Sequence, residues 1–237
     1  MPTDKERLAK YASEKLALEG ARLSDSYYYQ SLPLCIIDSV FSIGVRYGQV
    51  LNVIETFCRQ TGWVRYRVHG SAFPAKADQQ TVSNLLEVLG HHPNPEKSLF
   101  HNSGYANPAA KEESRILKAN LVKQFAAALV AREIDTYEDL KSYPKPECLD
   151  CSLCGLPSLK SGVVVRYFRM LAGDDTQVKP DRMILRFLCE ALGSSVGTDE
   201  AVELVRGASS ILEKDFPGMN PRLLDHEIWK YQRGRSR

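Results

Sequence analysis

The sequence predicts an all-α fold. Apolar residues recur at spacings of three and four over most of the chain, which is the pattern of a helix with one buried face. Alternation of apolar and polar residues, which indicates strands, does not extend over a useful length anywhere. There is no internal repeat and no low-complexity segment. The 237 residues are enough to bury a large core without disulfide bonds.

Helices in the first part of the chain are predicted from apolar faces bordered by charged or polar residues. They span residues 4–22, 34–43, 50–57 and 81–89. The second and third are either one bent rod or two segments joined near Gly44 to Gly48. Residues 62–78 could form a loop or a short irregular ribbon, and residues 91–108 are expected to be a long loop.

The longest helical pattern of the chain covers residues 112–133, with Lys118 and Lys123 on its polar face. A short helix is expected at 137–141, followed by a break at Pro144 to Pro146. Four further helices are predicted at 162–171, 181–192, 199–212 and 221–231. Gly173 and Gly193 mark two helix ends, because glycine readily adopts the left-handed conformation that ends helices.

Composition and charge exclude some classes of protein. Hydrophobic residues make up 43% and charged residues 25%, and 31 Lys and Arg against 29 Asp and Glu give a net charge of +2. The chain therefore does not bind nucleic acid through bulk charge, as histones do. No apolar run reaches the roughly 18 to 20 residues of a membrane span, and the first residues lack a secretory signal. We expect a soluble cytoplasmic protein without a membrane partner.

The six cysteines fall into two groups. Three of them, Cys35, Cys58 and Cys189, lie in apolar periodic segments, where a thiol is expected to be a small buried hydrophobe. The other three follow a Cys-x-x-Cys-x-x-Cys spacing that can converge on zinc or an iron–sulfur cluster: Cys148, Cys151 and Cys154. No fourth ligand lies nearby. Three reduced thiols at the start of a helix are the alternative, and we predict no cofactor.

The stretch from Leu156 to Gly173 and the one from Val178 to Leu188 carry the functional information. A Leu-Pro-Ser-Leu-Lys-Ser-Gly turn precedes an apolar helix, a loop follows it, and Lys-Pro-Asp-Arg-Met begins the next helix. This arrangement resembles the helix-hairpin-helix DNA glycosylase superfamily, of the endonuclease III kind. In that family a Leu-Pro-Gly-x-Gly hairpin precedes a catalytic Asp in a Val-Asp-x-His-Val-x-Arg context. Asp181, Ile184 and Arg186 fall on matching positions of the second motif.

The resemblance covers most of residues 34–192 and implies a two-lobed helical fold with a helix-hairpin-helix element and a central cleft. The whole chain would be one catalytic unit. One lobe would span approximately residues 25–172 and end in the hairpin helix, and residues 1–24 with 173–237 would form the other. The implied protein is a monomeric DNA N-glycosylase, located in the cytoplasm at the nucleoid. It would flip a damaged or modified base out of double-stranded DNA and hydrolyse its glycosidic bond.

The resemblance also implies roles for individual residues. Asp181 would stabilise the oxocarbenium character that develops at C1′ and activate water. Backbone amides at the start of the hairpin helix can bind a phosphate, so the implied DNA contacts are Ser158, Lys160, Ser161, Gly162 and Arg182. The helix near the cleft and the polar loop at residues 100–108 would line the base pocket through Ser42, Arg46, Tyr47, Asn102 and Tyr105.

Other functions stay open at the level of sequence. Lys160 could attack C1′ and add strand-cleaving lyase activity. The hairpin departs from the family at Ser158, and Gly44 replaces a Gln that fills the gap left by a flipped base in many relatives. A DNA-binding protein that has lost catalysis is therefore the main alternative. A third is an interaction protein built on a metal bound by the cysteine triplet. Base-excision repair and defence against phages with modified DNA are both compatible with a glycosylase.

Overall fold

The computed structural model describes residues 2–68 and 70–235, and the chain forms two compact units. We call Asp25–Ala172 the central unit, and Met1–Ser24 together with Gly173–Arg237 the terminal unit. Secondary structure among the described residues consists of helices and two isolated bridges, Tyr29 with Tyr66 and Tyr105 with Leu117. The predicted all-α class is confirmed.

The described part of the central unit contains the helices from α2 to α9. They are α2 (Leu32–Phe41), α3 (Tyr47–Thr61), α4 (Val82–His91), α5 (Pro95–Ser98), α6 (Lys118–Val130), α7 (Tyr137–Ser142), α8 (Pro146–Cys154) and α9 (Val163–Leu171). Three short 3-10 helices lie in the connections, at Asp25–Tyr27, Lys76–Asp78 and Glu112–Ser114.

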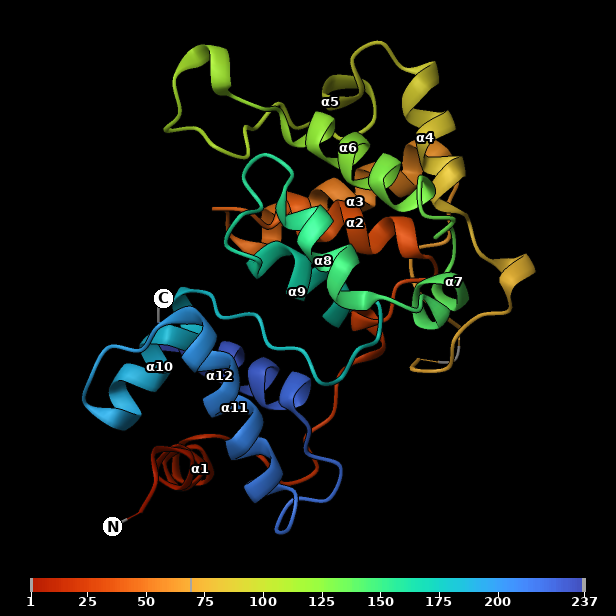
Figure 1. Ribbon diagram of the computed structural model, residues 1–237. Helices are drawn as coiled ribbons and strands as arrows, with labels where there is room; N and C mark the ends of the chain where they lie inside the picture. The colour runs from red at the N-terminus through yellow and green to blue at the C-terminus, as the bar shows by residue number, and fades with distance from the viewer. Residues whose placement is uncertain (1, 69, 236–237) are drawn as a thin grey trace. The chain divides into compact units, whose positions relative to one another are not determined.

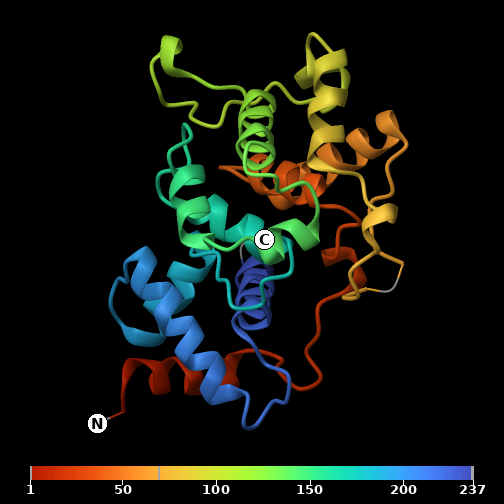
Figure 2. The ribbon, with the colours of Figure 1, turned by 45° about the vertical axis from the view of Figure 1, so that its right-hand side comes forward.

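Helix α2 lies at the middle of the central unit, because all but two of its ten residues are apolar. All ten of them are buried, and α3, α4, α6 and α9 pack around it (Figure 1 and Figure 2). Its one acidic residue, Asp38, accepts a hydrogen bond of 2.7 Å from the Tyr29 hydroxyl. Aromatic side chains complete the core, among them Phe125 and Phe168, whose ring centroids lie 4.9 Å apart.

The terminal unit contains α1 (Asp4–Lys15), α10 (Arg182–Leu192), α11 (Thr198–Leu212) and α12 (Pro221–Arg235). Helix α1 packs on α10 and α11, and α12 packs on the same two helices. A capping box fixes the start of α1, since Thr3 accepts from the Glu6 amide and Glu6 accepts from the Thr3 amide at 2.7 Å. Buried leucines and Phe187 form a core separate from that of the central unit.

Several predicted elements have different limits in the structure. Helix α1 ends at Lys15 rather than at residue 22, because the chain becomes extended at Leu16. The predicted helices at 34–43 and 50–57 are two helices rather than one bent rod: α2 ends at Phe41 and α3 begins at Tyr47, with Gly44 between them at φ +65°. The predicted loop at 91–108 contains the short helix α5. Cys189 is exposed, so its prediction as a buried thiol was wrong, whereas Cys35 is buried as expected.

The predicted helix at 112–133 begins only at Lys118. Upstream of it the backbone pairs with the preceding loop: Ala106 N donates to Ile116 O at 2.9 Å, and Ile116 N donates to the Asn107 side chain at 2.9 Å. These hydrogen bonds occupy the backbone N–H and C=O groups of Ile116, which a longer helix would need for its own hydrogen bonds. The apolar residues Ile116 and Leu117 therefore continue the helical pattern in sequence without being helical.

None of the helices in the described part of the chain combines the length and the apolar character that crossing a membrane requires.

Candidate functional site

Asp181 is the N-cap residue of α10, and its side chain is fixed by the helix that follows it. The Asp181 Oδ1 atom accepts hydrogen bonds from the amides of Met183 at 2.8 Å and Ile184 at 3.3 Å. The backbone at Asp181 is extended, as expected for a cap. The partial positive charge at a helix N-terminus favours a carboxylate here. Arg182, the first residue of α10, is exposed.

The connection between α8 and α9 is a compact turn anchored by the buried side chain of Leu159. Leu159 N donates to Leu156 O at 3.2 Å, and Gly162 N donates to Leu159 O at 2.9 Å. Gly162 is the N-cap of α9 at φ +71°, and Ser158 has φ +68°. The structure therefore brings together four predicted DNA contacts in one turn, with Lys160 and Ser161 exposed.

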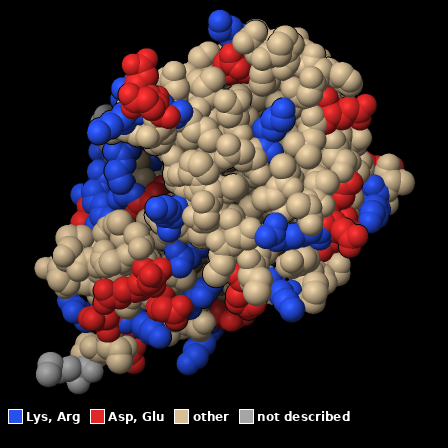
Figure 3. Space-filling model, turned by 45° about the horizontal axis from the view of Figure 1, so that its top comes forward, with Lys and Arg blue, Asp and Glu red and all other residues tan. Residues whose placement is uncertain are grey.

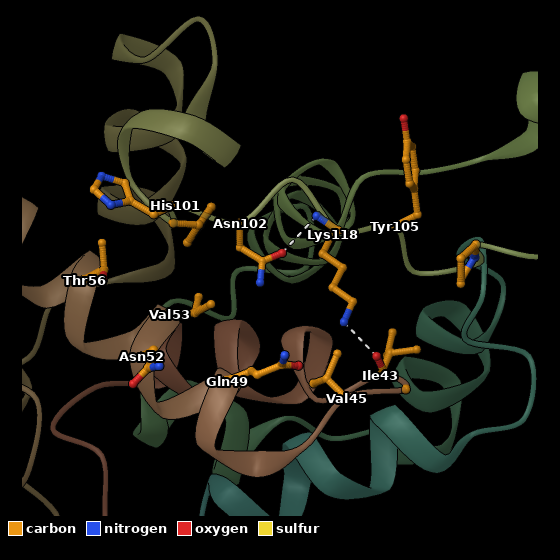
Figure 4. Close-up of a pocket in the computed structure, with 14 residues that line it drawn as sticks. Ile43, Val45, Gln49, Asn52, Val53, Thr56, His101, Asn102, Tyr105 and Lys118 are labelled. Atoms are coloured by element: carbon orange, nitrogen blue, oxygen red, sulfur yellow. Dashed lines mark hydrogen bonds between the residues drawn. The ribbon is translucent and has the colours of Figure 1, made fainter.

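A cavity of about 550 Å³ lies in the central unit between α3 and the loop after α5 (Figure 4). Helix α3 contributes Gln49, Asn52, Val53 and Thr56, and the loop contributes Phe100, His101, Asn102, Gly104, Tyr105 and Pro108. The connection between α2 and α3 adds Ile43, Gly44 and Val45, and α6 adds Lys118. Asp and Glu are absent from the described residues that line the cavity.

Two predicted base-pocket residues, Asn102 and Tyr105, line this cavity. Asn102 is held by its own loop, since its Oδ1 atom accepts from Gly104 N at 2.9 Å and its backbone N donates to Glu96 O at 2.7 Å. Its side chain points toward the cavity (Figure 4). Tyr105 remains 41% exposed at the edge of the cavity, and the Arg115 guanidinium lies 5.8 Å from the centroid of its ring.

The other three predicted base-pocket residues, Ser42, Arg46 and Tyr47, do not line the cavity. Ser42 ends α2 and donates from its hydroxyl to Ser39 O at 2.8 Å. Arg46 precedes α3 and is exposed. Tyr47 packs against the core of the central unit, and this burial raises the pKa of its hydroxyl above the ordinary range.

Lys118 lines the cavity and, like Gln49 and Asn52, is a site residue that the sequence did not predict. It is only 2% exposed, and its Nζ atom donates to the carbonyls of Phe41 at 3.0 Å and Ile43 at 2.7 Å. The assignment of Lys118 to a polar helix face was wrong. Lys118 precedes the apolar residues Leu121, Val122 and Phe125 by three, four and seven positions. This spacing puts Lys118 on the buried face of α6 and could have revealed its burial. Burial lowers the pKa of the Lys118 amine to about 8.

The cysteine triplet lies on α8, from its first turn to its last residue. Cys148 and Cys151 are exposed, and Cys154 is partly buried. Burial raises the pKa of the Cys154 thiol, which favours the protonated form over the thiolate that metals bind. Among the residues that the structure describes, no group of three or more His, Cys, Asp or Glu side chains is arranged to bind a metal ion.

Comparison with known proteins gives one relationship. No curated protein matches the chain, and no solved structure matches it. One family profile, described as "Domain of unknown function (DUF8548)", matches residues 6–233. This match extends over nearly the whole sequence and includes Asp181, the turn between α8 and α9 and the cavity of the central unit. The chain therefore belongs to the DUF8548 family.

Proposed function

We propose that the protein is a DNA N-glycosylase in which Asp181 is the catalytic carboxylate. The observation that carries the proposal is the attachment of Asp181 to the N-terminus of α10 through Oδ1. Cleavage of the bond between C1′ and the base nitrogen gives the sugar oxocarbenium character, which a fixed negative charge stabilises. The same carboxylate can orient water for attack on C1′. The products are a free base and an abasic site.

The turn between α8 and α9 is the proposed phosphate-binding element, with α8 and α9 as the two helices of a helix-hairpin-helix. The first amides of α9 follow Gly162 and are available in the way that helix N-termini bind anions. Lys160 and Ser161 are exposed beside them. Arg182, exposed on α10, is a further proposed phosphate contact. Flipping one base out of a duplex costs a few kcal/mol, and these phosphate contacts would offset that cost.

The cavity of the central unit is the proposed site for a base that leaves the stack. Amide side chains from Gln49, Asn52 and Asn102 supply both donors and acceptors, and Tyr105 supplies an aromatic face. Uncharged planar rings with polar edges fit this combination. The absence of acidic groups among the described lining residues disfavours a cationic ligand. Ser42, Arg46 and Tyr47 do not belong to this proposed pocket.

Lyase chemistry at Lys160 receives less support than hydrolysis. A lysine that forms a Schiff base needs an environment that favours the neutral amine, usually an enclosed apolar site. Lys160 is exposed on the turn between α8 and α9. We therefore propose a monofunctional enzyme. We further propose that it acts as a monomer on double-stranded DNA, in the cytoplasm at the nucleoid. The excised base decides between base-excision repair and defence against phages with modified DNA.

A panel of duplexes tests this function. Each duplex carries one uracil, alkylated, oxidised, mismatched or phage-type modified base, and heating in alkali converts abasic sites to strand breaks. We expect breaks at one class of base with the wild-type protein, and no breaks before the alkali step. Breaks without alkali would indicate a lyase. Tight DNA binding without product on any duplex would favour a non-catalytic DNA-binding protein.

A further inference from the structure

The segment that leads to Asp181 is bound by two buried charged residues of α12. Asp225 is 5% exposed, and its Oδ1 atom accepts a hydrogen bond of 2.7 Å from the backbone N–H of Lys179. Arg222 is 4% exposed and lies 3.1 Å from the Asp175 carboxylate. Its backbone N also donates to Asp175 O at 3.2 Å. Helix α12 thus contacts this segment at Asp175 and at Lys179.

The Lys179 contact is the one closest to the proposed catalytic residue. Pro180 has no N–H to donate, and the Asp181 N–H donates to Lys179 O at 2.6 Å. Val178, on the other side of Lys179, is fully buried. The backbone between the core and the start of α10 is therefore fixed at Lys179 by a side chain from a different helix.

Asp225 can accept this hydrogen bond in either charge state, through a carboxylate oxygen or through the carbonyl oxygen of the protonated carboxyl. Burial raises the pKa of Asp225 to about 8, and the charge of Asp181 adds to the increase. The Lys179 hydrogen bond and the charges of Lys179 and Arg222 act in the opposite direction. From α11, Arg206 contacts the same segment through Thr176 O at 2.9 Å. His226, next to Asp225 on α12, has its pKa lowered by burial to about 4 and is neutral.

We propose that Asp225 is a positioning residue for Asp181: its buried carboxyl binds the Lys179 N–H and thereby fixes the direction in which Asp181 presents its carboxylate. The inference rests on the proposed function, because it assigns the purpose of the contact to catalysis. A small displacement of a catalytic group can reduce the rate about 100-fold. Losing the contact should therefore lower kcat. DNA affinity should change little, since the proposed phosphate contacts do not include Asp225.

The kinetic test compares Asp225→Asn with Asp225→Leu. The Asn side-chain oxygen can accept the same N–H, so kcat should stay within about threefold of the wild type, whereas Leu should lower kcat roughly 10- to 100-fold with KM within about threefold. Glu227→Gln is the matched control, because Glu227 is also a buried acid on α12, 3% exposed, and pairs with Lys230 rather than with the segment. Equal kcat values in Asp225→Leu and Glu227→Gln would overturn the inference.

A second measurement does not depend on activity. In the free protein, we expect the Lys179 amide to exchange its hydrogen at least about tenfold faster in Asp225→Leu than in Asp225→Asn, with α10 and α11 amides unchanged. The wild-type Lys179 amide shift should also titrate near pH 8, and in Asp225→Asn it should not. Equal Lys179 exchange rates in the two variants, together with no titration of the wild-type Lys179 shift, would overturn the contact itself. If the exchange difference and the titration are both observed but the wild type excises no base, the contact stands, and the proposed function and the catalytic purpose of Asp225 are refuted.

Discussion

Asp181 caps α10 and, in our proposal, stabilises the charge that develops on the sugar. The two roles make different demands on the side chain. Capping needs only an oxygen that accepts hydrogen bonds from the amides of Met183 and Ile184. Stabilising an oxocarbenium needs a full negative charge. Asn satisfies the first demand and fails the second, so a single substitution separates the stability of the protein from its chemistry.

The structure predicts how the cap responds to substitution. Asn is as good an N-cap as Asp, so Asp181→Asn should change the free energy of unfolding by less than about 0.5 kcal/mol. Ala has no side-chain oxygen, so Asp181→Ala should lower the free energy of unfolding by about 0.5 to 2 kcal/mol. Urea denaturation of the three proteins measures both values. Equal losses in the two variants would contradict the capping geometry at Asp181.

Asp225 predicts a pH dependence of stability. Its folded pKa of about 8 lies above the value of about 3.9 expected in the unfolded chain. Between these two values unfolding releases a proton, so the free energy of unfolding falls as pH rises, by up to about 1.4 kcal/mol per pH unit. The loss should level off above the folded pKa. Thermal unfolding of wild type and Asp225→Asn from pH 5 to 9 measures it. A constant difference between the two proteins would contradict the burial-induced shift.

At the scale of elements, the turn between α8 and α9 uses backbone conformations that L-residues rarely adopt. Gly162 accepts φ +71° without steric cost, whereas Ser158 at φ +68° does so at a cost. The buried Ser158 hydroxyl also has no hydrogen-bond partner among the described residues. The turn therefore stores strain at Ser158 next to the groups that we propose to bind phosphate.

Substitutions in this turn should have opposite effects. Gly162→Ala should lower the free energy of unfolding by about 1 to 2 kcal/mol, the cost of the left-handed conformation for an L-residue, and Ser158→Gly should leave it unchanged or raise it by up to about 1 kcal/mol. Gly197→Ala is the control, because Gly197 has φ −73° and open space around it. Chemical denaturation gives all three values. A Gly162→Ala protein with the free energy of unfolding of the wild type would contradict the left-handed conformation of Gly162 in this turn.

The sequence predicts best those helices whose ends are marked by a capping residue or a helix-ending glycine. Helix α10 begins within one residue of the predicted start and ends at the predicted residue, because Asp181 caps its start and Gly193 ends it at φ +75°. Helix α6 begins later than predicted because its upstream residues pair with Asn107 and Ala106, a tertiary contact that periodicity does not reveal. Caps act within a few residues of the helix end, whereas such pairing depends on where a distant loop lies.

The same distinction applies to the candidate site. Asn102 and Tyr105 were found because a polar, aromatic loop already stands out in the sequence. Gln49 and Asn52 were missed, since on an amphipathic helix they are indistinguishable from solvent-facing residues until α3 packs beside that loop. Lys118 was missed because a lysine is rarely buried, and the carbonyls that bind it come from the end of a different helix.

At the scale of the whole molecule, the net charge of +2 leaves the proposed DNA binding to local groups. On the face drawn in Figure 3, Lys and Arg side chains cluster in one area, and Asp and Glu side chains lie beside this cluster and among the other Lys and Arg side chains. The proposed phosphate contacts are few, at the turn between α8 and α9 and at Arg182. The last turn of α12 contains Arg233 and Arg235, of which Arg235 is paired with Glu190 at 2.6 Å.

This distribution predicts a modest salt dependence of DNA binding. Each neutralised phosphate contributes about −0.9 to the slope of log K against log salt concentration. About three to six phosphate contacts therefore correspond to a slope of about −3 to −5. Lys160→Ala should make the slope less negative by about one unit. Binding titrations from low to physiological salt measure both. A slope near −10, as in proteins with many phosphate contacts, would contradict binding through few phosphate contacts.

The central claim, that Asp181 performs base excision, is tested most directly by single-turnover kinetics on the duplex that the wild type cleaves best. Asp181→Asn should fold with the stability of the wild type, bind that duplex with a dissociation constant within about threefold, and excise its base at least about 100-fold more slowly. Excision at the wild-type rate by a folded Asp181→Asn protein would contradict the claim.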